Sequence, residues 1–219
     1  MRIRCFPSSN RMSSVDFMGG SLHNHPVNVK QIDDLVLQDA IDWGGEEAFC
    51  VGAKKHPDHV ERLIWIMAML SGTPGRILDV GSGSGYISHR LRQAGNKVVS
   101  LEASPRWMAF AKDRYSGEYV HGVAERLPFR DGAFGGVLLA EILEHVENPM
   151  RVLREASRVS ARHSRLVATF PSTWHSIDEP DHVRFIDPTE GRQYLELAGY
   201  VIYGHASNAH FFAYFARNK

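Results

Sequence analysis

Three residues near the middle of the chain have the types and spacing of a catalytic or metal-binding group: Glu141, Glu144 and His145. If this segment forms a helical turn, positions i, i+3 and i+4 project from one face. Carboxylate oxygens suit magnesium or manganese, and an imidazole shifts the preference towards manganese, iron or zinc. His145 could instead act as a general base, or Glu144 and His145 could form a purely structural pair. The spacing leaves all three interpretations open.

A glycine-rich turn lies upstream of this group, directly after an apolar run at residues 77–80. Its glycines alternate with other residues: Gly81, Gly83 and Gly85. Glycine adopts positive φ and leaves no Cβ between the backbone and a ligand. In a parallel sheet such a turn lies at the carboxyl end of a strand, where open α/β folds bind ligands. Because Tyr86 stands where a dinucleotide fingerprint has its last glycine, the turn favours a ligand without a pyrophosphate.

An acidic residue closes the next apolar run, where Glu102 precedes a helix predicted to begin at Pro105. A carboxylate at the tip of the second strand lies beside the ribose of a bound ligand and can accept hydrogen bonds from both hydroxyls. The turn and this acid together predict a nucleoside ligand.

The elements that must position these residues alternate along the chain. Apolar runs predict seven strands, at 76–80, 97–102, 118–122, 136–140, 165–170, 200–205 and 210–216. Helical patterns are found at 57–70, 84–94 and 105–115, from residue 148 onwards, and at 188–198. This alternation indicates a mostly parallel sheet covered on both faces. The last two runs should pair as a hairpin that adds one antiparallel strand.

The first 72 residues differ from the remainder. Residues 1–30 are rich in Arg and Ser, and we expect a loosely ordered, flexible tail; the alternative is an organelle-targeting segment. An apolar stripe at helical spacing begins at Gln31, so residues 31–72 are predicted to form an N-terminal helical cap. Residues 73–219 are predicted to form the main α/β domain.

Composition limits the classes of partner. The chain has 219 residues, of which 43% are hydrophobic, so it can bury a sizeable core. Its 25 basic and 25 acidic residues cancel, which argues against nucleic acid as the partner. No apolar run approaches the roughly 20 residues that span a bilayer, so we expect no membrane span. Two cysteines cannot form a disulfide framework, and a cytoplasmic location fits best.

Four linked segments resemble, in the right order, the class I S-adenosylmethionine-dependent methyltransferases. They are the run from Asp79 to Gly85, the strand end at Glu102, the stretch from Gly122 to Phe129, and the segment from Phe134 to Pro149. The resemblance implies a three-layer Rossmann-like, doubly wound α/β fold whose sheet has seven strands, mostly parallel with an antiparallel C-terminal hairpin strand. It also implies S-adenosylmethionine as the cofactor. The predicted cofactor-binding residues are Asp79, Gly81, Ser82, Gly83, Gly85, Glu102, Ala103, Ala124, Glu125 and Ala140.

By the same resemblance, Asp79 would orient the glycine turn, and Gly81 and Gly83 would admit the methionine part of the cofactor. Ala124 and Glu125 would flank the adenine. The chain departs from the family pattern at two positions where the family usually has Asp, which here hold Val123 and Gly135. Neither departure touches the glycine turn or the ribose-binding acid.

The Glu-x-x-Glu-His spacing resembles two metal-dependent branches of this family, the O-methyltransferases of ubiquinone biosynthesis and the small-RNA 2′-O-methyltransferases. Both branches pair it with a later histidine, which here is His182. The implied metal ligands for Mg or Mn are Glu141, Glu144, His145 and His182, and the catalytic residues are Glu144, His145 and His182. A bound cation lowers the pKa of an acceptor hydroxyl, or a histidine takes its proton directly.

We therefore expect an enzyme that methylates oxygen on a small-molecule acceptor such as a phenol, a sugar or a polyketide-like metabolite. Trp174 is a candidate for stacking on that acceptor. The alternatives are an RNA ribose 2′-O-methyltransferase and a cofactor-binding scaffold without catalysis. Five arginines spaced by three or four could contact RNA phosphates or form a solvated face: Arg151, Arg154, Arg158, Arg162 and Arg165. Oligomeric state leaves no signal in the sequence.

Overall fold

The structure, a computed structural model, describes residues 14–17, 57–172 and 182–219. Its strands are β1 (Ser14–Phe17), β2 (Arg76–Val80), β3 (Lys97–Glu102), β4 (Glu118–His121), β5 (Phe134–Ala140), β6 (Ser160–Pro171), β7 (Tyr200–Ser207) and β8 (Phe211–Asn218). Its helices are α3 (Pro57–Leu70), α4 (Tyr86–Gln93), α5 (Pro105–Arg114), α6 (Pro149–Val159) and α7 (Pro188–Leu197), with a short 3-10 turn, η2 (Leu143–His145).

All these strands form one sheet in the order β1-β7-β8-β6-β5-β2-β3-β4. The pairs from β4 through β3, β2 and β5 to β6 are parallel, whereas β8 is antiparallel to both β6 and β7. The seven expected strands and the closing hairpin are therefore confirmed. The structure adds β1, which pairs antiparallel with β7 at the sheet edge and lies within the residues expected to form a tail.

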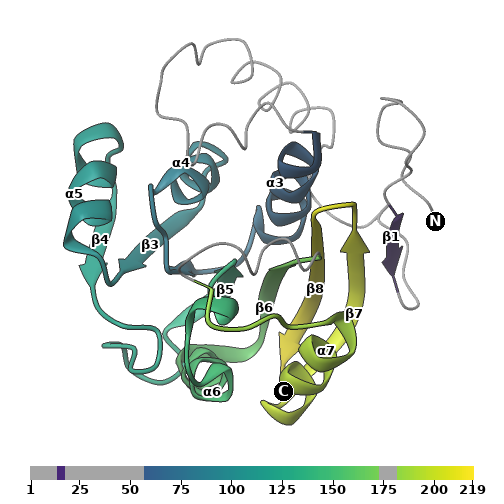
Figure 1. Cartoon of the computed structure of the whole chain (residues 1–219). Helices are drawn as coiled ribbons and strands as arrows, with labels where there is room; N and C mark the ends of the chain where they lie inside the picture. Colours follow the sequence, from purple (N-terminus) through teal and green to yellow (C-terminus); the bar gives the residue numbers. More distant parts are fainter. Residues whose placement is uncertain (1–13, 18–56, 173–181) are drawn as a thin grey trace.

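Helices cover both faces of the sheet, with α3, α4 and α5 on one side and α6 and α7 on the other (Figure 1). Successive side chains of a strand point to opposite faces of the sheet, so the protein has one hydrophobic core on each face. In β2, Leu78 and Val80 belong to the hydrophobic cluster that includes α6 and α7, whereas Ile77 belongs to the cluster that includes α3 and α4. Because both faces are covered, the central strands are buried on both sides.

The helices begin where the sequence places capping residues. The Ser104 hydroxyl accepts a hydrogen bond from the Trp107 amide at the start of α5, and Pro105 takes the first helical position. Asn148 caps α6 in the same way, with Pro149 next, and Asp187 caps α7. The first of these helices begins directly after β3, whose last residue is Glu102.

Only part of the N-terminal region lies within the described residues. Of the expected cap at 31–72, the structure describes α3, which packs on β6 and β8 and shares a buried core with β2. Arg165 donates from β6 to the carbonyls of Met69 and Ser71 and so holds the C-terminal end of α3 on the sheet. The helix expected from residue 31, and Trp174, lie outside the described residues. Within them, no helix is long and apolar enough to cross a membrane.

Candidate active site

The three glycines of the turn after β2 all have positive φ, but the space around them differs. A Cβ on Gly81 would lie 2.6 Å from Cδ1 of Ile142, and one on Gly85 would lie 2.8 Å from Cβ of Ala111. A Cβ on Gly83, whose φ is 52°, would meet nothing within 4 Å. Gly83 is therefore the glycine of this turn that borders open space. The space expected beside Gly81 is taken by Ile142, so this glycine is needed for close packing.

Glu102 joins the end of β3 to the glycine turn, as the sequence predicts for a ribose-binding acid. One carboxylate oxygen accepts a hydrogen bond from the Gly83 amide at 2.7 Å, and the other accepts from the Ser104 amide at 2.8 Å. A carboxylate has about four acceptor positions, so two remain for the hydroxyls of a ligand.

A second observation, on Ser82, indicates that the residues of the turn fit a nucleoside cofactor. The Oγ of Ser82 is buried, and no hydrogen-bond partner is present for it among the described residues. Buried hydroxyls are nearly always hydrogen-bonded in folded proteins. An unpaired hydroxyl beside Gly83 and Glu102 is what a polar ligand would satisfy, so S-adenosylmethionine fits the residues present.

Asp79 acts on the helix that follows the turn. Its carboxylate accepts a hydrogen bond of 2.6 Å from the Ser88 hydroxyl of α4. Ser100 donates to Ser88 in turn, and Arg92 donates to Ser100, so a chain of hydrogen bonds links α4 to β3. Burial raises the pKa of Asp79 to about 6, although the hydrogen bond from Ser88 opposes the shift. Asp79 thus positions the turn indirectly, by fixing the helix that begins at its end.

The predicted adenine-binding residues follow β4 at the same edge of the sheet. Ala124 is buried, whereas Val123 beside it is 51% exposed. Arg151 donates to the carbonyl of Glu125, which fixes this loop to α6. Of the other predicted residues, Ala103 accepts a hydrogen bond from the imidazole of His121, and Ala140 ends β5.

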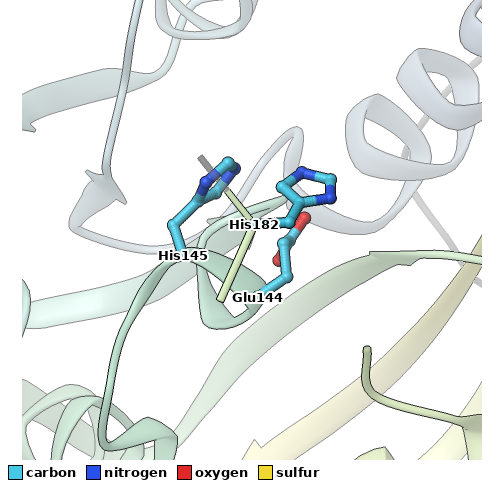
Figure 2. Close-up of side chains that lie close together, drawn as sticks. All are labelled: Glu144, His145 and His182. Atoms are coloured by element: carbon cyan, nitrogen blue, oxygen red, sulfur yellow. The ribbon is translucent and has the colours of Figure 1, made fainter. Parts of the chain in front are cut away.

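Glu144, His145 and His182 form a group at the end of β5. Each offers a potential ligand atom, and these atoms all lie within 4.8 Å of one another. The rings of His145 and His182 are edge to face, with 4.6 Å between their centroids. Figure 2 shows that Glu144 and His145 come from one turn and His182 from a separate segment. The structure thus brings together residues that are far apart in the sequence.

Backbone contacts hold His182 beside this turn. The amide of Val183 donates to the carbonyl of Glu144 at 3.0 Å. The guanidinium of Arg184 donates to the carbonyls of Val146 and Glu147 at 3.1 and 2.6 Å. Arg184 could not be identified from the sequence, because an arginine that binds the backbone carbonyls of a distant loop leaves no motif.

Glu144 is a buried acid that lacks a partner among the described residues. Glu144 is 1% exposed, and neither of its carboxylate oxygens has a hydrogen-bond partner among the described residues. Nδ1 of His182 is likewise buried and unpaired. Burial raises the pKa of Glu144 well above its ordinary value, and the nearby charge of Glu141 raises it further. Such a carboxyl is stabilised either by a proton or by a cation.

Glu141 does not join this group, contrary to the prediction from its spacing. Its backbone has a φ of 52°, so no helical turn connects it to Glu144. Its carboxylate accepts a hydrogen bond from Thr169 at 2.7 Å and pairs with Arg62 of α3 at 3.5 Å. Burial raises the pKa of Glu141, while Arg62 and Thr169 oppose that rise. The potential cation ligands in the described residues are therefore three rather than the four predicted.

The arginine series does not form one binding face. Arg158 donates to Glu155, to Asp131 and to the carbonyls of Leu127 and Phe129. Arg165 holds the end of α3, as described above. These side chains are used inside the fold, so the periodic spacing gives no support to phosphate binding by the whole series.

Comparison with known proteins shows which proteins the chain resembles. Residues 78–168 match the family model described as a methyltransferase domain. A mitochondrial ubiquinone biosynthesis O-methyltransferase of Schizosaccharomyces pombe is 30% identical over 157 residues, which cover 66% of this chain and 56% of that protein. A demethylmenaquinone methyltransferase of Thermotoga maritima is 31% identical over 102 residues, which cover 45% of this chain and 44% of that protein.

The chain spans 29 to 44% of the length of the first curated relatives that it matches. Among solved structures, an S-adenosylmethionine-dependent methyltransferase from Mesorhizobium loti superimposes with a TM-score of 0.63 and 16% identity, covering 76% of this chain and all of that one. At this identity the likeness concerns the fold. Residues 78–168 thus match a methyltransferase domain, and the chain resembles the class I S-adenosylmethionine-dependent methyltransferases in both sequence and fold.

Proposed function

We propose that this chain transfers the methyl group of S-adenosylmethionine to the oxygen of a hydroxyl on a small molecule, of the phenol, sugar or polyketide-like class. In this proposal Gly83, Ser82 and Glu102 bind the cofactor. Glu144, His145 and His182 bind the acceptor side of the reaction, with a divalent cation of the magnesium or manganese type held between them.

The observation that carries the proposal is the direct contact between the two parts of the site. Ile142, which lies between Glu141 and Glu144 in the sequence, reaches so close to the glycine turn that a Cβ on Gly81 would lie 2.6 Å from its Cδ1. The two parts follow β2 and β5, which are neighbours in the sheet. Methyl transfer needs an acceptor close to the methyl donor and in line with it, and this arrangement supports such placement.

The chemistry divides between the two parts. When bound, S-adenosylmethionine supplies a methyl group on a sulfonium, which leaves without needing a proton. A hydroxyl is a poor nucleophile near neutral pH, so the chain must help it lose its proton. Burial raises the pKa of Glu144 and favours its protonated form, and in the absence of a cation we assign the general base to the imidazole of His145 or His182. A divalent cation, when bound, lowers the pKa of the acceptor hydroxyl.

Support for oxygen as the acceptor atom comes from the group itself and from one relative. Carboxylate and imidazole ligands suit a cation that binds hydroxyl oxygens. The S. pombe relative is described as an O-methyltransferase of ubiquinone biosynthesis. That description motivates phenols as the first acceptors to test.

The test follows a labelled methyl group. The full chain is incubated with S-adenosylmethionine labelled in its methyl group and with a metabolite extract, and the products are identified by mass shift and by their site of labelling. We expect one labelled methyl on an oxygen, and we expect Glu144→Gln and His182→Ala to lower the rate at least a hundredfold. Glu147→Gln is the matched control, because Glu147 is an exposed acid in the same loop and its carbonyl, not its carboxylate, binds Arg184.

Three outcomes would count against parts of the proposal. Label on carbon or nitrogen would contradict the O-methyl assignment. Full activity in Glu144→Gln would remove this group from the reaction. Turnover that is unchanged by a chelator would exclude the cation and leave the histidines as the bases.

A further inference from the structure

Arg62 is a nearly buried cation that faces the acceptor side of the site. It lies on α3, its side chain is 16% exposed, and its Nη1 lies 3.5 Å from a carboxylate oxygen of Glu141. Its guanidinium also lies over the ring of Phe211, 4.5 Å from the centroid. Burying a guanidinium is costly unless a charge or a π-system compensates it, so Arg62 is fixed at this position.

The carboxylate of Glu141 is held by contacts that lie outside the Glu144 group. Thr169 of β6 donates to the same oxygen that Arg62 approaches. The backbone of Glu141 adopts a φ of 52°, which is unfavourable for a residue with a side chain and persists only where its surroundings enforce it. Two contacts and a strained backbone therefore keep this carboxylate outside the group formed by Glu144, His145 and His182.

The charge of Arg62 acts close to that group, because its guanidinium pairs with Glu141, which lies three residues before Glu144 in the chain. A positive charge at this position also repels any other cation that approaches.

We propose that Arg62 is a positioning residue that holds Glu141 out of the cation site and, by its charge, limits the affinity of that site for a divalent cation. The inference rests on the proposed cation at Glu144, His145 and His182. It assigns the cation three ligands from the chain, which leaves coordination positions for the oxygens of the acceptor, as catalytic metal sites require.

The test measures binding of Mn²⁺ alone to the full chain, by calorimetry and by the electron paramagnetic resonance signal of free Mn²⁺, without cofactor or acceptor. Arg62→Gln removes the charge and releases Glu141, so we expect the affinity to rise about tenfold, on the order expected for one nearby like charge. Arg62→Lys keeps the charge and should stay within about threefold of the wild type. An increase in affinity cannot result from misfolding.

Two further variants test the role of Glu141. In the wild-type background Glu141→Gln should lower Mn²⁺ affinity less than tenfold, whereas Glu144→Gln should lower it at least a hundredfold. Adding Glu141→Gln to Arg62→Gln should remove part of the gain, because the released carboxylate no longer contributes. Arg76→Gln is the control for loss of an arginine, since Arg76 pairs with Glu118 at the surface.

The inference is overturned if Arg62→Gln binds Mn²⁺ no more tightly than the wild type, including the case in which neither binds it. It is also overturned if Glu141→Gln alone is as damaging as Glu144→Gln. Both results leave methyl transfer itself to be judged by the labelled-methyl assay, so failure of this inference and failure of the proposed function are distinguishable.

Discussion

At the scale of single residues, Asp79 links the chemistry of one carboxyl to the stability of the fold. Burial raises its pKa to about 6, from 3.8 in an unfolded chain. The folded state therefore binds this proton more tightly than the unfolded state does. As pH rises from about 4 to about 6, the contribution of Asp79 to stability falls, and above about pH 6 it stays constant.

We expect Asp79→Asn to abolish this dependence while its amide oxygen still accepts the hydrogen bond from Ser88. Relative to the wild type, the variant should gain about 2 kcal/mol between pH 4 and pH 7, from the linkage of about 1.36 kcal/mol per pKa unit. Urea denaturation of both proteins at several pH values measures the difference, and the other buried acids cancel because both proteins contain them. A constant difference across this range would show that the pKa of Asp79 is not raised.

Gly135 and Val123 stand where the related family usually has Asp, but the structure explains only one of them sterically. A Cβ on Gly135 would lie 1.7 Å from the carbonyl oxygen of Pro74, so no side chain fits there. Val123 is half exposed and has room for a polar replacement. The departure at Gly135 therefore reflects packing and gives no support to a scaffold without catalysis.

We predict that placing Asp at these two positions changes the stability of the protein by very different amounts. Gly135→Asp should destabilise the protein by about 3 kcal/mol or more, because the backbone must move and a charge is placed in a tight contact. Val123→Asp should change stability by less than about 0.5 kcal/mol. Thermal denaturation of both variants measures these changes. A Gly135→Asp variant as stable as the wild type would contradict the packing explanation.

Some of the site residues could be predicted from the sequence, whereas the positions of Glu141 and Ile142 could not. Glu144, His145 and His182 follow from their spacing and from a resemblance, and the structure does bring them together. The position of Glu141 could not be predicted in this way, because it depends on Arg62 and Thr169, which come from distant elements and have no motif. Likewise, alternate glycines indicate a turn, but only tertiary contacts show that Ile142 fills the space beside Gly81.

At the scale of elements, the loop between β4 and β5 is held on α6 chiefly by the contacts of Arg158. Arg158 binds two carboxylates and two carbonyls of this loop and helix, and the amide of Leu127 donates to Glu155. This loop contains the residues predicted to flank the adenine, Ala124 and Glu125. A helical arginine series thus positions a binding loop, which its periodicity alone does not reveal.

We expect Arg158→Ala to lower the free energy of unfolding by about 2 kcal/mol, because several charge-assisted hydrogen bonds are lost from a side chain that is partly screened by solvent. Arg154→Ala, an exposed arginine on the same helix, should change it by less than about 0.5 kcal/mol. Chemical denaturation of the two variants provides the comparison. Equal stability of both would contradict the role assigned to Arg158.

Elements were predictable where a local pattern specifies them. The apolar runs, the helix that begins at Asn148 and the closing hairpin all match the structure. Strand β6 begins at Ser160, earlier than its apolar run, because Ser160 pairs with Phe134 before a shift in register. The expected helical turn at Glu141 is absent since η2 begins only at Leu143. Long-range pairing determines both differences.

At the scale of the whole molecule, the parallel order of the central strands explains why distant motifs meet. The carboxyl ends of β3, β2 and β5 are adjacent, so Glu102, the glycine turn and the Glu144 group lie along one edge of the sheet. Strand β6, α3 and the segment at His182 add side chains from further away. The topology, more than any single motif, brings the proposed donor and acceptor residues to one edge of the sheet.

The most direct test of this account is calorimetric titration of the full chain with S-adenosylmethionine, comparing the wild type with Gly83→Ala and Gly132→Ala. Both glycines have positive φ, and a Cβ on either would meet nothing within 4 Å, so both variants carry similar backbone strain. We predict that the wild type and Gly132→Ala bind one cofactor per chain with similar affinity, and that Gly83→Ala binds it at least tenfold more weakly. No binding by the wild type, or equal affinity in all three proteins, would contradict the assignment of this turn as the cofactor site.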